Sequence, residues 1–358
     1  MADLITRHGP VPLPNFFPDA TYGAIRATGF EDMEGSGLTG LVMNSYHLMN
    51  RPGSKAIKAM GGLNAFTGFP GPILTDSGGF QLYSLIRENP AYGEIRPGGI
   101  IFRPDMGREK LDFTPEKCIQ AQFQYGSDIM MALDVCTAPD DPYEVQKRSV
   151  DLTVAWGRRC REAFDTLTAG MRGQRPLLFG IVQGGADRDL RIECGKRLEE
   201  IGFDGYGFGG WPLDADGRYR EDVLRYACEA MPDHKPKYAM GLGRPEEIVR
   251  LVKMGYSLFD CVIPTREARH QRLYVFKEGE EIWREDGKFY AFHYALDERH
   301  ARDSRPVDET CACPLCSGHS RAYLYHLFKI GDAQALRLAS AHNLFFYGRL
   351  MERLREGA

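Results

Sequence analysis

Short apolar runs recur along the chain, with segments of helical spacing between them. The runs occupy residues 40–43, 72–75, 128–133, 177–182, 206–209, 237–240 and 258–261. Runs of this length are typical of buried strands. In the segments between them, Thr114 is a suitable helix N-cap, and Pro245 and Gly255 mark the start and end of RPEEIVRLVKMG. Such alternation predicts parallel strands joined by crossover helices, in an open sheet or a closed barrel.

The residue at which each run stops favours the barrel. Almost every run ends on a polar side chain or a glycine: Asn44, Asp76, Asp134, Gln183, Gly209-Gly210, Gly241 and Asp260. In an eight-stranded barrel all C-terminal strand ends meet at one mouth, whereas an open sheet gathers only those near its switch point. The fold class is therefore α/β, a (β/α)8 TIM barrel. The absence of a Gly-x-Gly-x-x-Gly helix start and of a Walker lysine motif argues against nucleotide-cofactor folds.

Composition is consistent with a soluble protein large enough for such a barrel. The 358 residues are 43% hydrophobic and 26% charged, with a mean hydropathy of -0.37. No apolar stretch is long enough to span a membrane, and the N-terminus does not read as a signal peptide, so a cytoplasmic location is expected. A net charge of -4 gives no global indication of nucleic-acid binding.

The C-terminal quarter departs from the strand and helix alternation. Residues 265–310 are charged and rich in aromatic side chains, and the sequence that follows predicts two or three terminal helices. We therefore expect a catalytic barrel over residues 1–264. Residues 265–358 would form an inserted or appended subdomain with the closing helices.

Three of the nine cysteines are clustered in this subdomain. Cys311, Cys313 and Cys316 fall within six residues, a spacing typical of a metal site rather than of buried free thiols. A fourth ligand completes a tetrahedral, structural Zn²⁺ site. His342 on a predicted helix is one candidate, and spacing alone leaves His319 and His326 open. The ion would join the terminal helices to the barrel.

The strand-ending carboxylates suggest chemistry at an anomeric carbon. Asp76 precedes Ser-Gly-Gly, Asp260 lies in FDCVIPTR, and Asp134 is a third acid on the same rim. Singly, each could cap a turn. Two carboxylates at one barrel mouth can act as nucleophile and acid/base in a double displacement. Gln183, beside two glycines, has an amide suited to a base edge.

At these positions the chain resembles the tRNA-guanine transglycosylases, which exchange an encoded guanine for a 7-deazaguanine base. The motifs MNSYHLMNRPG, ILTDSGGFQ, GSDIMMALDVCT, FGIVQGG, IGFDGYGFGG, MGLGRPEEIV, DCVIPTR, CACPLC and SRAYLYHL occur in the family's order over nearly the whole chain. The resemblance implies a zinc-bearing barrel, usually a homodimer, that acts on the anticodon loop of tRNA with a free base as second substrate.

The resemblance also implies roles for individual residues. Asp260 corresponds to the nucleophile that attacks the ribose C1′, and Asp76 to the general acid/base. The other matched positions are Asp134, Gln183 and Gly210 at the base, Arg266 and Arg269 at the anticodon-loop backbone, and Cys311, Cys313, Cys316 and His342 at zinc. No ATP or redox cofactor is required.

An extruded base also needs contacts for its two faces. A guanine inside a structured loop must leave its stack before its glycosidic bond can be reached. Phe80 and Met240 could sandwich it, although ordinary core packing explains both equally well.

The chain departs from the family beside this base. Relatives that use the aminomethyl base typically read GGLAVGE, but here Gly210 is followed by Trp211, Pro212, Leu213, Asp214 and Ala215. Trp211 is expected next to the base. Ala215 and Val135 replace acids, and Asp214 could compensate or could simply form a turn. A different 7-substituent, such as the queuine side group or a nitrile, is therefore a hypothesis.

Other functions remain as alternatives. After Arg269 the chain reads His270-Gln271-Arg272, where the family usually has Asn-Gly-Gln, and some relatives act on DNA guanine. A non-catalytic tRNA-binding partner subunit would be expected to lose the nucleophile. A glycoside hydrolase would not need the arginines or the zinc motif.

Overall fold

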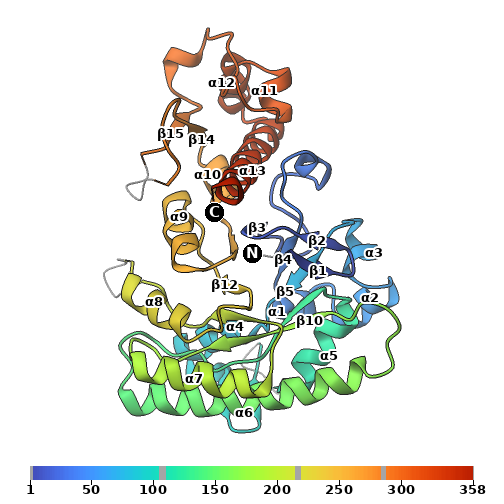
Figure 1. Cartoon of the computed structure of the whole chain (residues 1–358). Helices are drawn as coiled ribbons and strands as arrows, with labels where there is room; N and C mark the ends of the chain where they lie inside the picture. The colour runs from blue at the N-terminus through green and yellow to red at the C-terminus, as the bar shows by residue number, and fades with distance from the viewer. Residues whose placement is uncertain (1–2, 105–109, 214–218, 284–287, 358) are drawn as a thin grey trace.

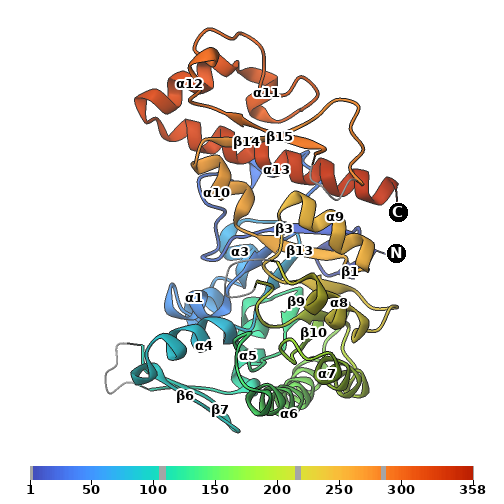
Figure 2. The same ribbon diagram turned by 90° about the vertical axis from the view of Figure 1, so that its left-hand side faces the viewer.

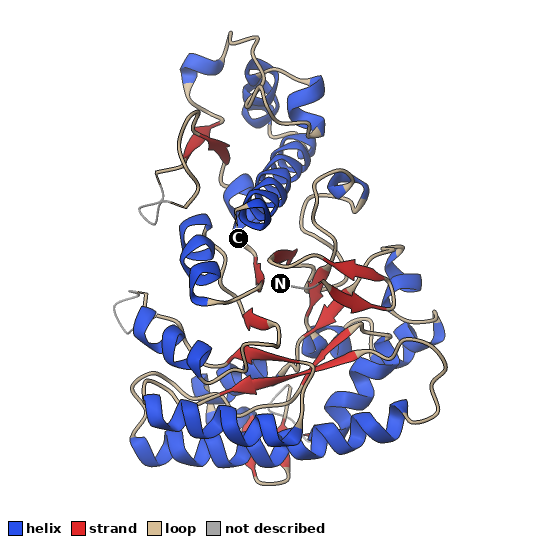
Figure 3. Ribbon diagram, viewed as in Figure 1, coloured by secondary structure: helices blue, strands red, loops and turns tan. Residues whose placement is uncertain are grey.

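The eight-stranded parallel sheet confirms the predicted barrel. The computed structural model describes residues 3–104, 110–213, 219–283 and 288–357. Around the barrel the strands run β3 (Asn15–Pro18), β13 (Leu258–Cys261), β12 (Lys237–Ala239), β11 (Gly205–Phe208), β10 (Leu177–Val182), β9 (Ile129–Met131), β5 (Ile73–Thr75) and β4 (Leu41–Met43). A parallel bridge between Asp19 and Val42 brings β4 back to the end of β3 (Figures 1 and 3).

Sequence analysis missed one of these strands. All seven predicted runs contain barrel strands, but β3 was not expected. Pro10, Pro12 and Pro14 precede it, and Pro18 is its last residue. Prolines argue against a strand because they remove backbone donors. In the structure all four residues are buried, and β3 pairs in parallel with β13 from Asn15 opposite Leu258 to Pro18 opposite Cys261.

Helices cover the outside of the barrel. They are α1 (Ser45–Asn50), α2 (Ser54–Ala59), α3 (Leu63–Thr67), α4 (Gly79–Glu88), α5 (Pro115–Tyr125), α6 (Tyr143–Thr168), α7 (Arg188–Ile201), α8 (Glu221–Glu229) and α9 (Pro245–Met254). The next helix, α10 (Ile263–Arg269), follows β13 and packs against the C-terminal helix α13 (Ala333–Glu356). Thr114 caps α5 by accepting from the Lys117 amide at 3.3 Å, as predicted. Gly255, with φ of 110°, ends α9. In the described part of the chain, no helix combines the length and apolar character that crossing a membrane requires.

Two small sheets fill out the barrel domain. The hairpin β1 (Leu4–Thr6) and β2 (Gly9–Val11) contributes Leu4 and Val11 to a buried cluster with barrel residues such as Met131 and Leu258. His8 in the turn of this hairpin contacts Asp128, directly before β9, at 3.0 Å, so the hairpin covers the end opposite the carboxyl ends of the strands. Between α4 and α5 an antiparallel sheet of β6 (Gly93–Arg96), β7 (Gly99–Phe102) and β8 (Leu111–Phe113) was not predicted.

The last quarter of the chain lies above the barrel (Figures 1 and 2) and contains a separate hydrophobic cluster. It consists of the hairpin β14 (Arg272–Phe276) and β15 (Tyr290–Tyr294), the 3-10 turn η3 (Glu298–His300) and the helices α11 (Pro314–Gly318), α12 (Arg321–Ile330) and α13 (Ala333–Glu356). The three helices agree with the upper number expected. The division of the chain at residue 264 remains a prediction.

Helix α13 connects this cluster to the barrel. Asn343 donates to the Pro264 carbonyl at 2.9 Å, and the Tyr347 hydroxyl donates to the Gly243 carbonyl at 2.6 Å. At Gly348 the helix lies so close to the loop before β4 that a Cβ would overlap the Ser36 carbonyl oxygen. A glycine is therefore required at this crossing.

We predict that Gly348→Ala weakens this contact. Because backbone must move to admit the methyl group, the free energy of unfolding should fall by about 1–3 kcal/mol, measured by chemical denaturation. Gly170→Ala is the matched control, since a Cβ at that position meets nothing within 4 Å. Equal stabilities of the two variants would contradict the prediction.

Candidate active site and metal centre

A cavity of about 390 Å³ opens at the carboxyl ends of the barrel strands. Three carboxylates line it: Asp76 after β5, Asp134 after β9 and Asp260 in β13. Apart from Tyr238, the other lining residues are small or apolar and include Ser77, Gly78, Ile181, Phe208, Gly209, Gly241 and Leu213. The strand ends therefore converge on one rim, as the sequence predicted.

Asp260 has one carboxylate oxygen held and the other available. Its Oδ1 accepts hydrogen bonds from the Tyr238 hydroxyl and the Gly241 amide, both at 2.7 Å. Within the described residues no hydrogen bond ends on Oδ2. Burial raises the pKa of Asp260 to about 6, against the opposing effect of the two donors. The group is thus mostly ionised at neutral pH and presents a free, oriented oxygen.

Asp76 is held more tightly but is harder to ionise. Its Oδ1 accepts from the amides of Ser45 and Gly78 at 3.0 Å, and its Oδ2 accepts from the Asn44 side chain at 2.6 Å. Burial raises its pKa to about 7, and the negative charge of Asp260 adds to the shift. A carboxyl group with a pKa near 7 can both give and take a proton at neutral pH.

Gln183 lies behind the cavity lining and forms a hydrogen-bonded pair with Asp134, which lines the cavity. The Gln183 amide nitrogen donates to Asp134 Oδ2 at 2.6 Å, and burial raises the pKa of Asp134 to about 6. Gln183 is fully buried, and its amide oxygen Oε1 has no hydrogen-bond partner. That oxygen faces Gly210, whose φ of 103° favours glycine. An unpaired buried acceptor suggests that a ligand supplies the missing donor.

Aromatic and thioether side chains flank these polar groups. Phe80 and Met240 both line the cavity. Phe80 is 45% exposed, so core packing does not account for it. Trp211 is 39% exposed and contacts Phe80, with the ring centroids 5.1 Å apart.

Of the two positions at which the family has an acid and this chain does not, Val135 and Ala215, the structure describes only Val135. Val135 is buried and lies outside the cavity lining, and its amide donates to Thr153. Asp214 and Ala215 lie outside the described residues, so the compensating role suggested for Asp214 stays a hypothesis.

Arg266 and Arg269 lie on α10, directly after the strand that carries Asp260. Burial lowers the pKa of Arg269, and the positive charges of Arg26 and Arg266 lower it further. The positive charges of Arg26 and Arg266 therefore both act on Arg269. Arg26 was not identified from the sequence, because an exposed arginine in an irregular loop gives no distinguishing pattern.

Arg191 is a second residue that the sequence analysis overlooked. It is 1% exposed and donates to the carbonyls of Val182, Gly185 and Gly209 at 2.8–3.0 Å. It thereby joins the loops after β10 and β11 behind the cavity. The sequence did hold one signal for it. Arg191 falls on the same face of its helix as Cys194 and Leu198, and a cation among residues of an apolar helix face indicates a buried, hydrogen-bonded charge.

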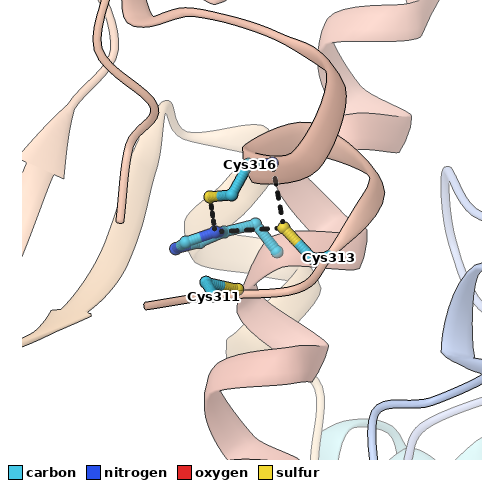
Figure 4. A group of neighbouring side chains, drawn as sticks. Cys311, Cys313 and Cys316 are labelled. Atoms are coloured by element: carbon cyan, nitrogen blue, oxygen red, sulfur yellow. Dashed lines mark hydrogen bonds between the residues drawn. The ribbon is translucent and has the colours of Figure 1, made fainter. Parts of the chain in front are cut away.

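The cysteine cluster forms a compact four-ligand site (Figure 4). One ligand atom each of Cys311, Cys313, Cys316 and His342 lies within 4.8 Å of the others. The His342 Nδ1 lies 3.4 Å from Cys313 Sγ and 3.3 Å from Cys316 Sγ. Its Nε2 contacts the Tyr274 carbonyl at 2.8 Å, which orients the ring as a metal ligand requires. The fourth ligand is His342, as the resemblance implied, while His319 stacks on Tyr323 instead.

Comparison with known proteins agrees with this geometry. A family model described as queuine tRNA-ribosyltransferase matches residues 1–357. The chain belongs to the queuine tRNA-ribosyltransferase family. It is 40% identical over 353 residues to the queuine tRNA-ribosyltransferase of Thermoanaerobacter sp. (strain X514), covering 99% of this chain and 88% of the relative. It is 38% identical over 347 residues to that of Novosphingobium aromaticivorans, with 97% and 88% covered.

The donor set of this family member fits structural zinc. Three cysteines and a histidine close a tetrahedral site and leave no position for substrate. The ligands come from the segment before α11, from α11 itself and from α13, so the ion joins elements that α13 in turn connects to the barrel.

We predict about one zinc ion per chain, with loss of it in Cys313→Ala. Unfolding should occur at a lower temperature in this variant, because three remaining ligands hold the ion weakly. Elemental analysis and calorimetry test both points. Cys228→Ala, which removes a buried thiol outside the cluster, should keep its zinc. Equal metal content in both variants would contradict the assignment.

Proposed function

We propose that this protein exchanges guanine at the wobble position of tRNA for a 7-deazaguanine base, within the queuosine pathway. The observation that carries the proposal is the pair of carboxylates, Asp260 and Asp76, lining one cavity in a chain that matches the transglycosylase family over its length. A non-catalytic partner subunit would not need both.

Asp260 would act as the nucleophile. Its free Oδ2 attacks the ribose C1′ of the target guanosine, the C1′–N9 bond breaks, and the bonding electrons leave with the guanine. Asp76, close to half protonated at neutral pH, gives the departing base a proton. The polynucleotide is then held on Asp260 as an ester.

The second half of the reaction reverses these roles. The N9–H of the incoming base gives its proton to Asp76, N9 attacks C1′, and the ester bond to Asp260 breaks. Two displacements at one carbon retain its configuration. Neither step consumes ATP or transfers electrons to a cofactor.

The cavity walls would bind the extruded base. Asp134 and the unpaired Gln183 oxygen accept hydrogen bonds from its ring and exocyclic N–H groups, and Gly210 leaves room for its edge. Phe80 and Met240 stack on its faces, and Trp211 closes the wall beside Gly210. All three described lining carboxylates then have roles, which leaves none for a primary ammonium group. This favours the uncharged nitrile precursor over the aminomethyl base and over queuine, whose secondary amine is also cationic at neutral pH.

The polynucleotide would lie over α10. Arg266 and Arg269, with Arg26 beside them, would bind phosphates of the anticodon loop. We propose further that the enzyme is a homodimer and works in the cytoplasm. Light scattering and cell fractionation test these two points.

We predict that the wild-type protein incorporates radiolabelled guanine into tRNA. Asp260→Asn should lower the rate at least about 1,000-fold, because the nucleophile is lost. Without an incoming base, wild type but not the variant should form a protein–RNA adduct that survives denaturing electrophoresis. Asp140→Ala, an exposed acid outside the cavity, is the control.

Parallel reactions with aminomethyl-deazaguanine, queuine and the nitrile base, each on tRNA and on DNA, identify the preferred incoming base and the preferred polynucleotide. Incorporation into DNA alone would replace tRNA by DNA in the proposal. Failure of wild type on every substrate would overturn it.

We also predict a bell-shaped pH dependence of single-turnover guanine release. Below about pH 6 the rate should fall as Asp260 becomes protonated, and above about pH 7 it should fall as Asp76 loses its proton. Asp76→Asn should be slow and lack the alkaline limb. Asp134 titrates near pH 6 as well, and its effect should appear in the KM for the free base. A flat profile between pH 5 and 9, a range chosen to span both pKa values, would contradict these roles.

A further inference from the structure

An exposed pair of aromatic rings lies at the mouth of the cavity. Phe80 follows β5 and Trp211 follows β11. In the barrel these strands are separated by β9 and β10, whose ends carry Asp134 and Gln183. The contact between the rings therefore bridges the rim above the base-binding pair. With 45% and 39% of Phe80 and Trp211 exposed, much of this apolar surface faces outward.

Because the two rings are inclined to each other, one planar base cannot stack on both. The two ring planes are inclined by 59°. A planar base stacked on Phe80 lies parallel to that ring, so it cannot also stack on the indole. The exposed part of Trp211 is thus available to a second ring.

The conformation and contacts of the neighbouring residues restrict the backbone at Trp211. Gly210 turns the chain with φ of 103°, and Pro212 restricts the backbone of the residue before it. The Pro212 carbonyl accepts from the Arg220 amide at 2.8 Å, and Leu213 pairs with Tyr219 as a β-bridge. With its backbone restricted and its ring against Phe80, Trp211 loses less conformational entropy when it binds a partner.

Extrusion of the target guanosine creates such a partner. When one base leaves the stack, its sequence neighbours lose a stacking surface and become exposed next to the enzyme. Proteins that bind single-stranded nucleic acid commonly place aromatic side chains against such bases. We propose that Trp211 is a polynucleotide-positioning residue on whose indole face a nucleobase adjacent to the extruded guanosine stacks. This inference rests on the proposed transglycosylase function.

The test is guanine-for-guanine exchange on an anticodon stem-loop RNA with guanine at the wobble position. Trp211→Leu should raise the KM for RNA about 5- to 150-fold, the equivalent of one lost base stack, with little change in kcat or in the KM for guanine. Trp211→Phe keeps a ring and should recover most of the loss. Ile5→Ala, an exposed apolar residue in the hairpin at the opposite end of the barrel, should behave as wild type.

Abasic RNAs identify the contact. Removal of the base on one side of the target should raise the KM of wild type and abolish its difference from Trp211→Leu. RNA binding should also quench tryptophan fluorescence in wild type but not in this variant. An unchanged KM for RNA, a rise in the KM for guanine instead, or a difference that persists with both abasic RNAs would overturn the proposal. Exchange by wild type at saturating RNA tests the underlying function separately.

Discussion

The pairing of β3 with β13 on one side, and its bridge to β4 on the other, closes the sheet. Every other feature of the site depends on this closure, because it turns eight strand ends into a ring. Asp76 and Asp260 lie 184 positions apart in the sequence, and only a closed ring places both on one cavity. In an open sheet β4 and β3 would form opposite edges, and the carboxylates after β5 and in β13 would lie far apart.

The three rim carboxylates share one effect of the closed barrel, desolvation, but differ in their hydrogen-bond donors. Burial raises the pKa of each, but the donors around them differ. Asp260 keeps one oxygen unbonded, whereas Asp76 has both oxygens bonded and also feels the charge of Asp260. Like groups in unlike surroundings can therefore take the separate tasks of nucleophile and acid/base.

The sequence predicted the barrel and the convergence of its strand ends because hydrophobic periodicity and the residues that end each strand are local signals. The helix cap at Thr114, the helix end at Gly255 and the three-cysteine motif are local signals too. It did not predict β3, whose strand character comes from its partners rather than from its proline-rich composition. It also missed Arg191, Arg26 and the support that Tyr238 gives Asp260, because a hydrogen bond between distant residues leaves no trace in sequence spacing. The choice of His342 over two other histidines likewise needed the family resemblance, and the structure then placed its ring among the thiols.

Helix α13 carries four unrelated contacts in under two turns. His342 reaches the metal-ligand cluster, and Asn343 reaches the first turn of α10. Tyr347 reaches the loop before α9, and Gly348 reaches the segment before β4. Each residue added to a helix rotates everything beyond it by about 100°. A one-residue insertion between 342 and 348 would therefore misdirect the barrel contacts if the metal contact were kept. Length, more than composition, is fixed in this stretch.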